Sequence, residues 1–232
     1  MKKDVFLIDA DDTVLDFHGT ASEALKEAFK GCGIEWQDGF AQTYKTLNES
    51  LWEALERKQL TRETLMNTRF HRLLQLLNLT TVSGDTFNKI YLNYLSTNPR
   101  YLDGAPAFLE ALNKKGRVYI VTNGTRWIQN SRFDIANLWQ YATGNKAGVF
   151  ISEDAGADKP DRRYTDYVLS KIENFDKARA LWVGDSLTAD IQAACEAGID
   201  CVWFNPNQKP LTGGAKPTYI VDNFSKILEI LG

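Results

Sequence analysis

Short, wholly apolar runs open the chain and recur through its second half. The first run, at residues 5–8, reads Val-Phe-Leu-Ile, which is typical of a strand buried on both faces. Similar runs lie at residues 118–121, 149–151, 180–183, 201–204 and near 219. Between them, apolar residues recur every three or four positions, as on one face of a helix. This alternation predicts an α/β fold with a Rossmann-like parallel sheet and right-handed crossovers.

A long helical block interrupts the alternation directly after the first strand. Residues 15–100 contain several stretches with helical spacing and no convincing strand. A capping box at residues 20–23 predicts one helix start, and Thr61 predicts another. The block ends at Asn98-Pro99, because the residue before a proline is disfavoured in a helix.

The position of the helical block predicts two domains. Because the block lies between the first and second strands, it is expected to be an insertion. Residues 1–14 and 101–232 then form one α/β core domain, and residues 15–100 form an all-helical cap domain. A chain of 232 residues is long enough for a core domain with a smaller domain inserted in it.

Charge and composition argue against binding to nucleic acid or to membranes. The net charge of −3 and the pI near 5.5 give no general attraction to nucleic acid or anionic lipid. No apolar run reaches membrane-spanning length, and the first residues do not resemble a signal peptide. We therefore expect a cytoplasmic monomer or dimer that binds neither nucleic acid polymers nor membranes. Cys32, Cys195 and Cys201 show no metal-binding spacing, so we expect three buried, reduced thiols.

Polar residues directly follow the predicted strands. In an open parallel sheet, ligands bind beyond the carboxyl ends of the strands. The residues at these ends are mostly small and oxygen-bearing, and they are Asp9, Asp11, Asp12, Thr122, Asn123, Gly124, Ser152, Glu153, Asp185 and Ser186. Oxygen ligands without His or Cys suit Mg²⁺ rather than zinc or copper. Asp9 and Asp185 are its expected direct ligands.

One feature supports a cation or a shared proton at this point, and another predicts an anion close to it. Strand alternation would project Asp9 and Asp11 to the same side, where their carboxylates repel unless a cation or a shared proton lies between them. Lys159 precedes Pro160, which is expected at the first position of a helix. A cation beside free helix amides favours an anion such as phosphate.

Three other residues complete the predicted site. The hydroxyl of Thr122 and the backbone N–H of Asn123 are available to the same phosphate. Asp190, on the first turn of the following helix, is expected to orient Lys159 or a metal-bound water.

Each of these features also has a purely structural explanation. An acidic pair is commonly part of a solvated loop, the segment 122–124 reads as an ordinary turn, and Asp190 complements a helix dipole. The order of the residues favours a functional site, because carboxylates, a hydroxyl, a lysine and further carboxylates follow successive strands.

This order resembles the motifs of the haloacid dehalogenase-like superfamily, which are DxDx(T/V), a strand-terminal Ser or Thr, a Lys, and (G/S)D with a further acid three to five residues later. The matching residues are Asp9-Ala10-Asp11-Asp12-Thr13, Thr122-Asn123-Gly124, Lys159-Pro160 and Gly184-Asp185 with Asp190. The helical insertion is similar to the family's type-one cap. Residues 141–148 depart from the pattern, because relatives run more directly into the third strand.

The resemblance implies an Mg²⁺-dependent phosphatase that forms an aspartyl-phosphate on Asp9. Asp11 would act as general acid and then as general base. The metal would be held by Asp9, Asp185 and the backbone carbonyl of Asp11. The groups that bind and stabilise the transferring phosphoryl group would be Thr122, Asn123 and Lys159. Dehalogenases of similar fold lack the second aspartate, which this chain has.

The helical insertion also looks like the cap of the pyrimidine-nucleotide 5′-phosphatase branch, in residues 51–57, 60–63 and 69–70. The expected substrate is a small phosphorylated metabolite such as a nucleoside 5′-monophosphate, which would make the enzyme a 5′-nucleotidase. Arg69 is expected on a solvated helix face, with contact to a phosphate or a base edge as the alternative. A sugar-phosphate phosphatase or mutase of the same family stays open, as does a signalling receiver domain that uses phospho-aspartate as a switch.

Overall fold

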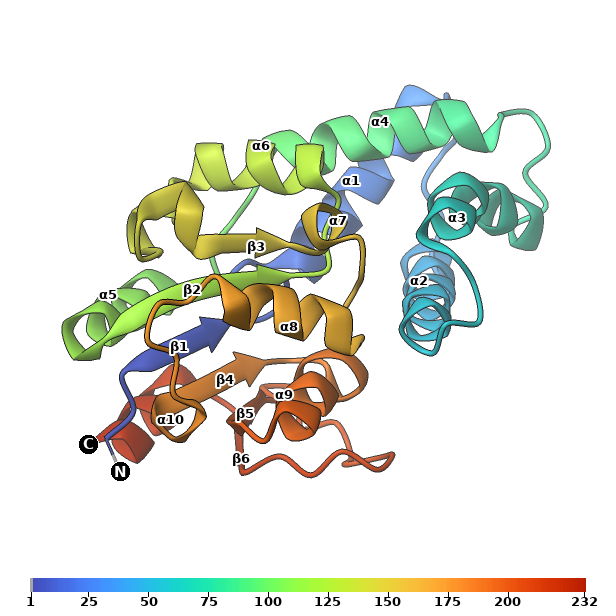
Figure 1. Cartoon of the computed structure of the whole chain (residues 1–232). Helices are drawn as coiled ribbons and strands as arrows, with labels where there is room; N and C mark the ends of the chain where they lie inside the picture. The colour runs from blue at the N-terminus through green and yellow to red at the C-terminus, as the bar shows by residue number, and fades with distance from the viewer. Residues whose placement is uncertain (1) are drawn as a thin grey trace. The chain divides into compact units, whose positions relative to one another are not determined.

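The computed structural model describes residues 2–232, which form two compact units. One unit combines the chain up to Phe17 with Pro99–Gly232, and the other is His18–Asn98. The sheet belongs to the first unit. The regular secondary structure described within His18–Asn98 is entirely helical (Figure 1). Among residues 2–232, no helix has both the length and the apolar composition needed to cross a bilayer.

A six-stranded parallel sheet of order β3-β2-β1-β4-β5-β6 forms the centre of the first unit. Its strands are β1 (Val5–Ile8), β2 (Arg117–Thr122), β3 (Val149–Ile151), β4 (Ala180–Gly184), β5 (Asp200–Phe204) and β6 (Tyr219–Val221). This sheet confirms the predicted α/β fold. The chain builds outward from β1 in one direction and then returns to β4 on its other side. The carboxyl ends of β1 and β4 therefore lie at the switch point where ligands bind in such sheets.

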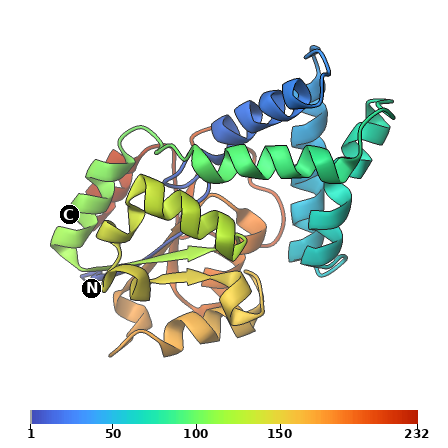
Figure 2. The ribbon, with the colours of Figure 1, turned by 90° about the horizontal axis from the view of Figure 1, so that it is seen from above.

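Helices cover both faces of the sheet, which explains why β1 contains apolar residues alone. Phe6 and Ile8 pack into one cluster, and Val5 and Leu7 pack into another on the opposite face. The first face is covered by α5 (Ala105–Lys115), α6 (Arg126–Ala136) and α10 (Phe224–Leu231), and the second by α8 (Arg162–Ser170) and α9 (Gln192–Ala197). Figure 2 shows α6 in yellow-green and α8 in orange on opposite sides of the strands.

The helices of the second unit are α1 (Phe17–Gly31), α2 (Phe40–Glu56), α3 (Arg62–Leu76) and α4 (Gly84–Thr97). Thr61 caps α3 as predicted, with its hydroxyl accepting a hydrogen bond from the backbone N–H of Thr64 at 3.1 Å. The predicted start of α1 at the capping box is wrong. The helix begins three residues before Thr20, because the preceding Leu15 is fixed by backbone bridges and the chain turns directly after it.

The lengthened segment before β3 folds back onto the sheet. Two 3₁₀ turns, Leu138–Tyr141 and Asn145–Gly148, flank Thr143. The backbone N–H of Thr143 donates to the carbonyl of Val118 at 2.8 Å, and its hydroxyl accepts from the N–H of Val118 at 2.9 Å. The extra residues therefore attach to β2, away from its carboxyl end.

All three cysteines are free, but only Cys201 is buried. The predicted burial is wrong for Cys32, which is partly exposed, and for Cys195, which is exposed and whose thiol donates to the carbonyl of Lys216 at 3.3 Å. The sheet-facing residues of α9 are Ala193 and Ala194, which leaves Cys195 on the outer side of the helix.

The second unit buries a guanidinium. The expectation that Arg69 lies on a solvated face is wrong, because only 2% of this residue is exposed. Its guanidinium carbon lies 4.6 Å from the centroid of the Phe70 ring and 5.2 Å from that of Tyr91. Its Nη1 donates to Asn48 Oδ1 at 3.1 Å, whereas Nε and Nη2 have no hydrogen-bond partner. The aromatic faces explain the burial, because they attract a cation and cover its apolar stem.

Replacing this arginine tests how its burial affects stability. Arg69→Met should leave the free energy of unfolding unchanged or raise it by about 1 kcal/mol, because an apolar side chain of similar volume removes the desolvation cost of a charge. Arg69→Ala should lower it by about 2–4 kcal/mol, because a cavity remains among the rings. Denaturant titration measures both, with Arg72→Ala at an exposed position of α3 as the control. Equal losses for Met and Ala would show that the polar contacts of Arg69 stabilise the unit.

Candidate active site

Residues from several strand ends meet around the Lys159 side chain, of which 2% is exposed. Its ammonium donates to Asp9 Oδ1 at 2.6 Å, to Asp190 Oδ1 at 2.7 Å and to the carbonyl of Val121 at 2.9 Å. These contacts use all three ammonium protons. Burial disfavours the charged form, but the adjacent carboxylates of Asp190 and Asp9 outweigh it and raise the pKa of Lys159, so the group remains a cation.

The backbone of Lys159 is fixed by Asn123. The side-chain amide of Asn123 accepts from the N–H of Lys159 at 2.7 Å and donates to its carbonyl at 2.9 Å. The prediction that Pro160 opens the next helix is wrong, because α8 begins at Arg162 with Asp161 as its N-cap, and the Lys159-Pro160 peptide is cis. Two hydrogen bonds from the end of β2, rather than a helix start, therefore hold Lys159 in place.

Asp9 lies directly after β1 and is only 5% exposed. Its Oδ2 accepts from the hydroxyl of Thr13 at 3.0 Å, while Oδ1 faces Lys159. Burial and the nearby charge of Asp190 raise the pKa of Asp9 to about 8, although Lys159 opposes this shift. The single positive charge of Lys159 therefore does not offset the combined effect of burial and of the neighbouring carboxylates on Asp9.

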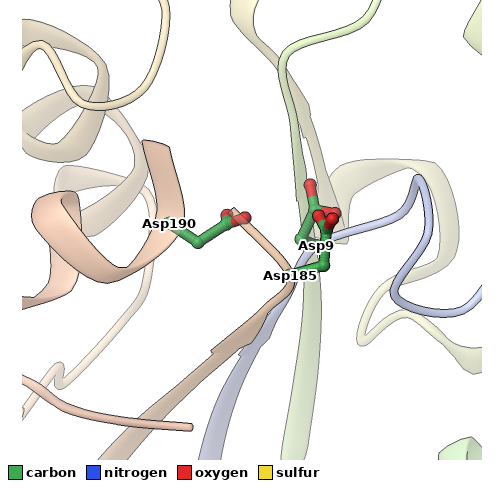
Figure 3. A group of neighbouring side chains, drawn as sticks. All are labelled: Asp9, Asp185 and Asp190. Atoms are coloured by element: carbon green, nitrogen blue, oxygen red, sulfur yellow. The ribbon is translucent and has the colours of Figure 1, made fainter. Parts of the chain in front are cut away.

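Three carboxylates converge at this point. Asp9, Asp185 and Asp190 each offer an oxygen, and these oxygens all lie within 4.8 Å of one another. Figure 3 shows Asp190 pointing from the start of its helix toward Asp9 and Asp185, which follow β1 and β4. Burial and the charges of Asp12 and Asp9 raise the pKa of Asp185 well above its ordinary value. The cluster is crowded with negative charge and contains only hard oxygen ligands, as a divalent cation site such as Mg²⁺ requires.

Both oxygens of Asp190 accept hydrogen bonds. Besides Lys159, Oδ1 faces Trp182 Nε1 at 3.3 Å, and Oδ2 accepts from the backbone N–H of Ser186 at 3.3 Å. Gly184 permits this packing, because a Cβ at that position would lie 2.2 Å from the carboxyl carbon of Asp190. Asp190 therefore orients Lys159, which is one of the two roles that the sequence suggested for it.

Asp11 has different neighbours from Asp9. Strand alternation does not reach it, because β1 ends at Ile8. Its Oδ1 accepts from Arg132 Nη1 at 2.6 Å, and its Oδ2 accepts from Gln129 Nε2 at 2.9 Å. The same amide nitrogen donates to the hydroxyl oxygen of Thr122 at 2.8 Å. The Asp11 and Thr122 side chains are thus joined through Gln129.

Gln129 and Arg132 are not among the site residues predicted from the sequence. Both are 1% exposed, and they lie three residues apart on α6 beside the buried Ile128 and Phe133. Polar residues at the apolar positions of an amphipathic helix were the available signal, because buried polar groups require partners.

Comparison with known proteins shows the family to which the chain belongs. The family model described as haloacid dehalogenase-like hydrolase matches residues 3–198. The chain belongs to this family of hydrolases. Family membership confirms the resemblance and decides against a signalling receiver domain.

Two bacterial relatives match this haloacid dehalogenase-like chain over nearly their whole length. The putative HAD-hydrolase YfnB of Bacillus subtilis is 35% identical, with 97% of this chain and 94% of the relative covered. The pyrimidine 5′-nucleotidase PynA of Streptococcus pneumoniae is 34% identical, with 97% and 93% covered.

Solved structures of this family superpose on the chain. The crystal structure of Bacillus subtilis YfnB bound to magnesium has a TM-score of 0.92 at 34% identity and covers 100% of this chain and 99% of its own. The L-2-haloacid dehalogenase of Xanthobacter autotrophicus, with a TM-score of 0.74 at 14% identity and coverage of 99% and 98%, shares the fold.

The close packing at Gly184 can be tested by substitution. Gly184→Ala should lower the free energy of unfolding by about 1–3 kcal/mol, because its methyl group must displace the Asp190 carboxyl group. The matched control is Gly214→Ala, where a Cβ meets nothing within 4 Å. Thermal unfolding of the two variants checks this, and equal melting temperatures would contradict the packing described at Asp190.

Proposed function

We propose that the protein is an Mg²⁺-dependent phosphate monoester hydrolase that transfers the phosphoryl group to Asp9. The observation that carries this proposal is the buried Asp9 carboxylate at the end of the central strand, between the ammonium of Lys159 and two further carboxylates. A stable structure gains nothing from three crowded carboxylates. Covalent phosphoryl transfer gives them a use, because it needs an anionic nucleophile next to strong positive charge.

The residues present fit a magnesium ion. Asp9 and Asp185 would hold it with one carboxylate oxygen each, together with the backbone carbonyl of Asp11. Asp190 is engaged on both oxygens by Lys159, Trp182 and Ser186, so it belongs to the support of the site. When bound, the ion supplies positive charge that reduces repulsion between the nucleophile and a phosphate dianion.

The first chemical step falls to Asp9 and Asp11. A carboxylate oxygen of Asp9 attacks phosphorus while the bond from phosphorus to the leaving oxygen breaks. The Asp11 carboxyl group gives its proton to that leaving oxygen. Thr122 accepts a hydrogen bond from Gln129, which leaves its hydroxyl proton to donate to a phosphoryl oxygen. Lys159 must release one of its three acceptors to make a similar contact.

The second step restores the enzyme. A water oxygen attacks phosphorus, the bond between phosphorus and Asp9 breaks, and the Asp11 carboxylate takes the proton from water. Inorganic phosphate leaves, and Asp9 is again a carboxylate. The two aspartates thus need different surroundings. Asp9 accepts a hydrogen bond from the ammonium of Lys159, and Asp11 accepts one from the guanidinium of Arg132.

We also propose that the substrate is a small phosphorylated metabolite, specifically a nucleoside 5′-monophosphate. The support is similarity to two proteins named pyrimidine 5′-nucleotidase, PynA at 34% identity and Escherichia coli YjjG at 28% identity over the whole chain. In this proposal the helical unit His18–Asn98 acts as a cap that selects the organic part of the substrate.

Phosphate release tests the proposed reaction. With Mg²⁺ the protein should hydrolyse p-nitrophenyl phosphate and pyrimidine nucleoside 5′-monophosphates, and Asp9→Asn should reduce the rate by about 10⁴-fold or more because the nucleophile is lost. The panel includes purine nucleotides, sugar phosphates and phosphoglycolate. Undiminished activity in EDTA or in Asp9→Asn would contradict the mechanism. A requirement for a bisphosphorylated activator would indicate a mutase instead.

A second measurement separates metal binding from catalysis. In EDTA, Asp185→Asn should raise the melting temperature by roughly 2–4 °C, because one of three crowded carboxylates loses its charge. Mg²⁺ should raise the melting temperature of the wild type, as any ligand of the folded state does, and should have little effect on Asp185→Asn. Asp103→Asn, at an exposed carboxylate, is the control. An unchanged response to Mg²⁺ in Asp185→Asn would place the ion elsewhere.

A further inference from the structure

The Gln129 and Arg132 side chains form a closed network with Asp11 and Thr122. Arg132 Nη1 donates both to Asp11 Oδ1 at 2.6 Å and to Gln129 Oε1 at 2.8 Å. Gln129 uses its two amide protons for Asp11 Oδ2 at 2.9 Å and for Thr122 Oγ1 at 2.8 Å. Because the amide oxygen faces a donor and the amide nitrogen faces two acceptors, the network sets the orientation of the Gln129 amide.

Packing holds this network in place. Gln129 and Arg132 are each 1% exposed, and the guanidinium carbon of Arg132 lies 5.8 Å from the centroid of the Phe17 ring. A Cβ at Gly124 would lie 2.2 Å from Gln129 Cγ, so the glycine that follows Thr122 and Asn123 makes room for the amide. Both residues lie on α6, three positions apart, and thus face the same way.

The charge of Arg132 is directed at Asp11. Its Nε and Nη2 have no hydrogen-bond partner, and among residues 2–232 its one carboxylate partner is Asp11. Burying a guanidinium with two incomplete donors costs stability. A core position would accommodate an apolar side chain at lower cost, so the arginine is better explained by what it does to Asp11.

We infer that Gln129 and Arg132 are positioning residues, which orient the Asp11 carboxyl group for the proton transfers of the reaction and the Thr122 hydroxyl for its hydrogen bond to the phosphoryl group. This inference rests on the proposed phosphatase function. Arg132 and Gln129 each take one oxygen of Asp11, which fixes the plane of the carboxyl group. Gln129 also fills an acceptor position of Thr122, so that its proton points away from α6. Neither residue forms or breaks a bond.

The leaving group of the substrate provides a selective test. The leaving oxygen of a nucleoside 5′-phosphate is an alkoxide and needs a proton from Asp11, whereas p-nitrophenolate leaves without one. Disturbing Asp11 should therefore affect nucleotides more than p-nitrophenyl phosphate. The ratio kcat/KM is the quantity to compare, because it reports the step in which Asp9 becomes phosphorylated and excludes the later hydrolysis.

The experiment compares UMP with p-nitrophenyl phosphate in Mg²⁺. Arg132→Met should lower kcat/KM for UMP by about 30-fold or more, and for p-nitrophenyl phosphate by less than about fivefold. Gln129→Leu also releases the Thr122 hydroxyl, so it should lower kcat/KM for both substrates, with the larger loss for UMP. Arg132→Lys should recover part of the loss, because an ammonium keeps the charge but loses the fixed fork of donors. Arg126→Met, at an exposed arginine on the same helix, should change neither value.

A double-mutant cycle separates positioning from a merely structural role. In an Asp11→Asn background, Arg132→Met should change kcat/KM for UMP by less than about twofold, because the group that it orients is already disabled. Arg132→Gln, which removes the charge but keeps a polar side chain, gives the same test if Arg132→Met does not fold.

Three results would overturn the inference. They are equal losses for both substrates in Arg132→Met, a loss in Arg132→Met that adds to that of Asp11→Asn, and an Arg132→Met variant faster than wild type, which would show that Arg132 hinders proton transfer by Asp11. A wild-type protein that hydrolyses neither substrate, or that is unaffected by Asp9→Asn, would instead contradict the proposed function itself.

Discussion

The bonds of one buried ammonium hold the site together. Lys159 reaches Asp9 after β1, the carbonyl of Val121 in β2 and Asp190 beyond β4, and so connects three neighbouring strands at their carboxyl ends. This arrangement depends on the strand order, because β1 lies between β2 and β4. The apolar sequence of β1 is therefore a requirement of the site as well as of the core. A central strand must be covered on both faces before its end can present a buried carboxylate.

Two aspartates that are two residues apart in the sequence have different chemical surroundings. Asp9 is 5% exposed and faces Lys159 and Thr13, whereas the Asp11 side chain is 28% exposed and faces Gln129 and Arg132. Identical side chains can take different roles only through such differences in environment. The proposed division into nucleophile and acid-base group thus follows from which element each carboxylate contacts. Asp9 contacts the loop after β3, and Asp11 contacts α6.

The sequence predicted the fold well and drew attention to carboxylates that the structure brings together, for a physical reason. Strands buried on both faces consist of apolar residues alone, so the polar residues at their ends, such as Asp9 and Asp185, stand out directly. Gln129 and Arg132 gave a weaker signal, their position on the apolar face of a helix, because polar residues within a helix usually face solvent. Arg69 was misplaced for the same reason. The helix start at Pro160 was wrong because the contacts that fix Lys159 come from Asn123, which is 36 residues away in the chain.

Glycines allow the side chains that support the site to pack closely against the strand ends. Gly184 lets the Asp190 carboxyl group lie against β4, and Gly124 lets the Gln129 amide lie against the end of β2. In both places a single methyl group would occupy the position of a polar side chain that orients another residue. Asp190 orients Lys159, and Gln129 orients Asp11 and Thr122. Gly124 and Gly184 are thus needed mainly because a larger residue would collide with Gln129 or Asp190, and less because of their backbone conformation. The reacting groups can be crowded together because the residues behind them are fixed from both sides of the sheet.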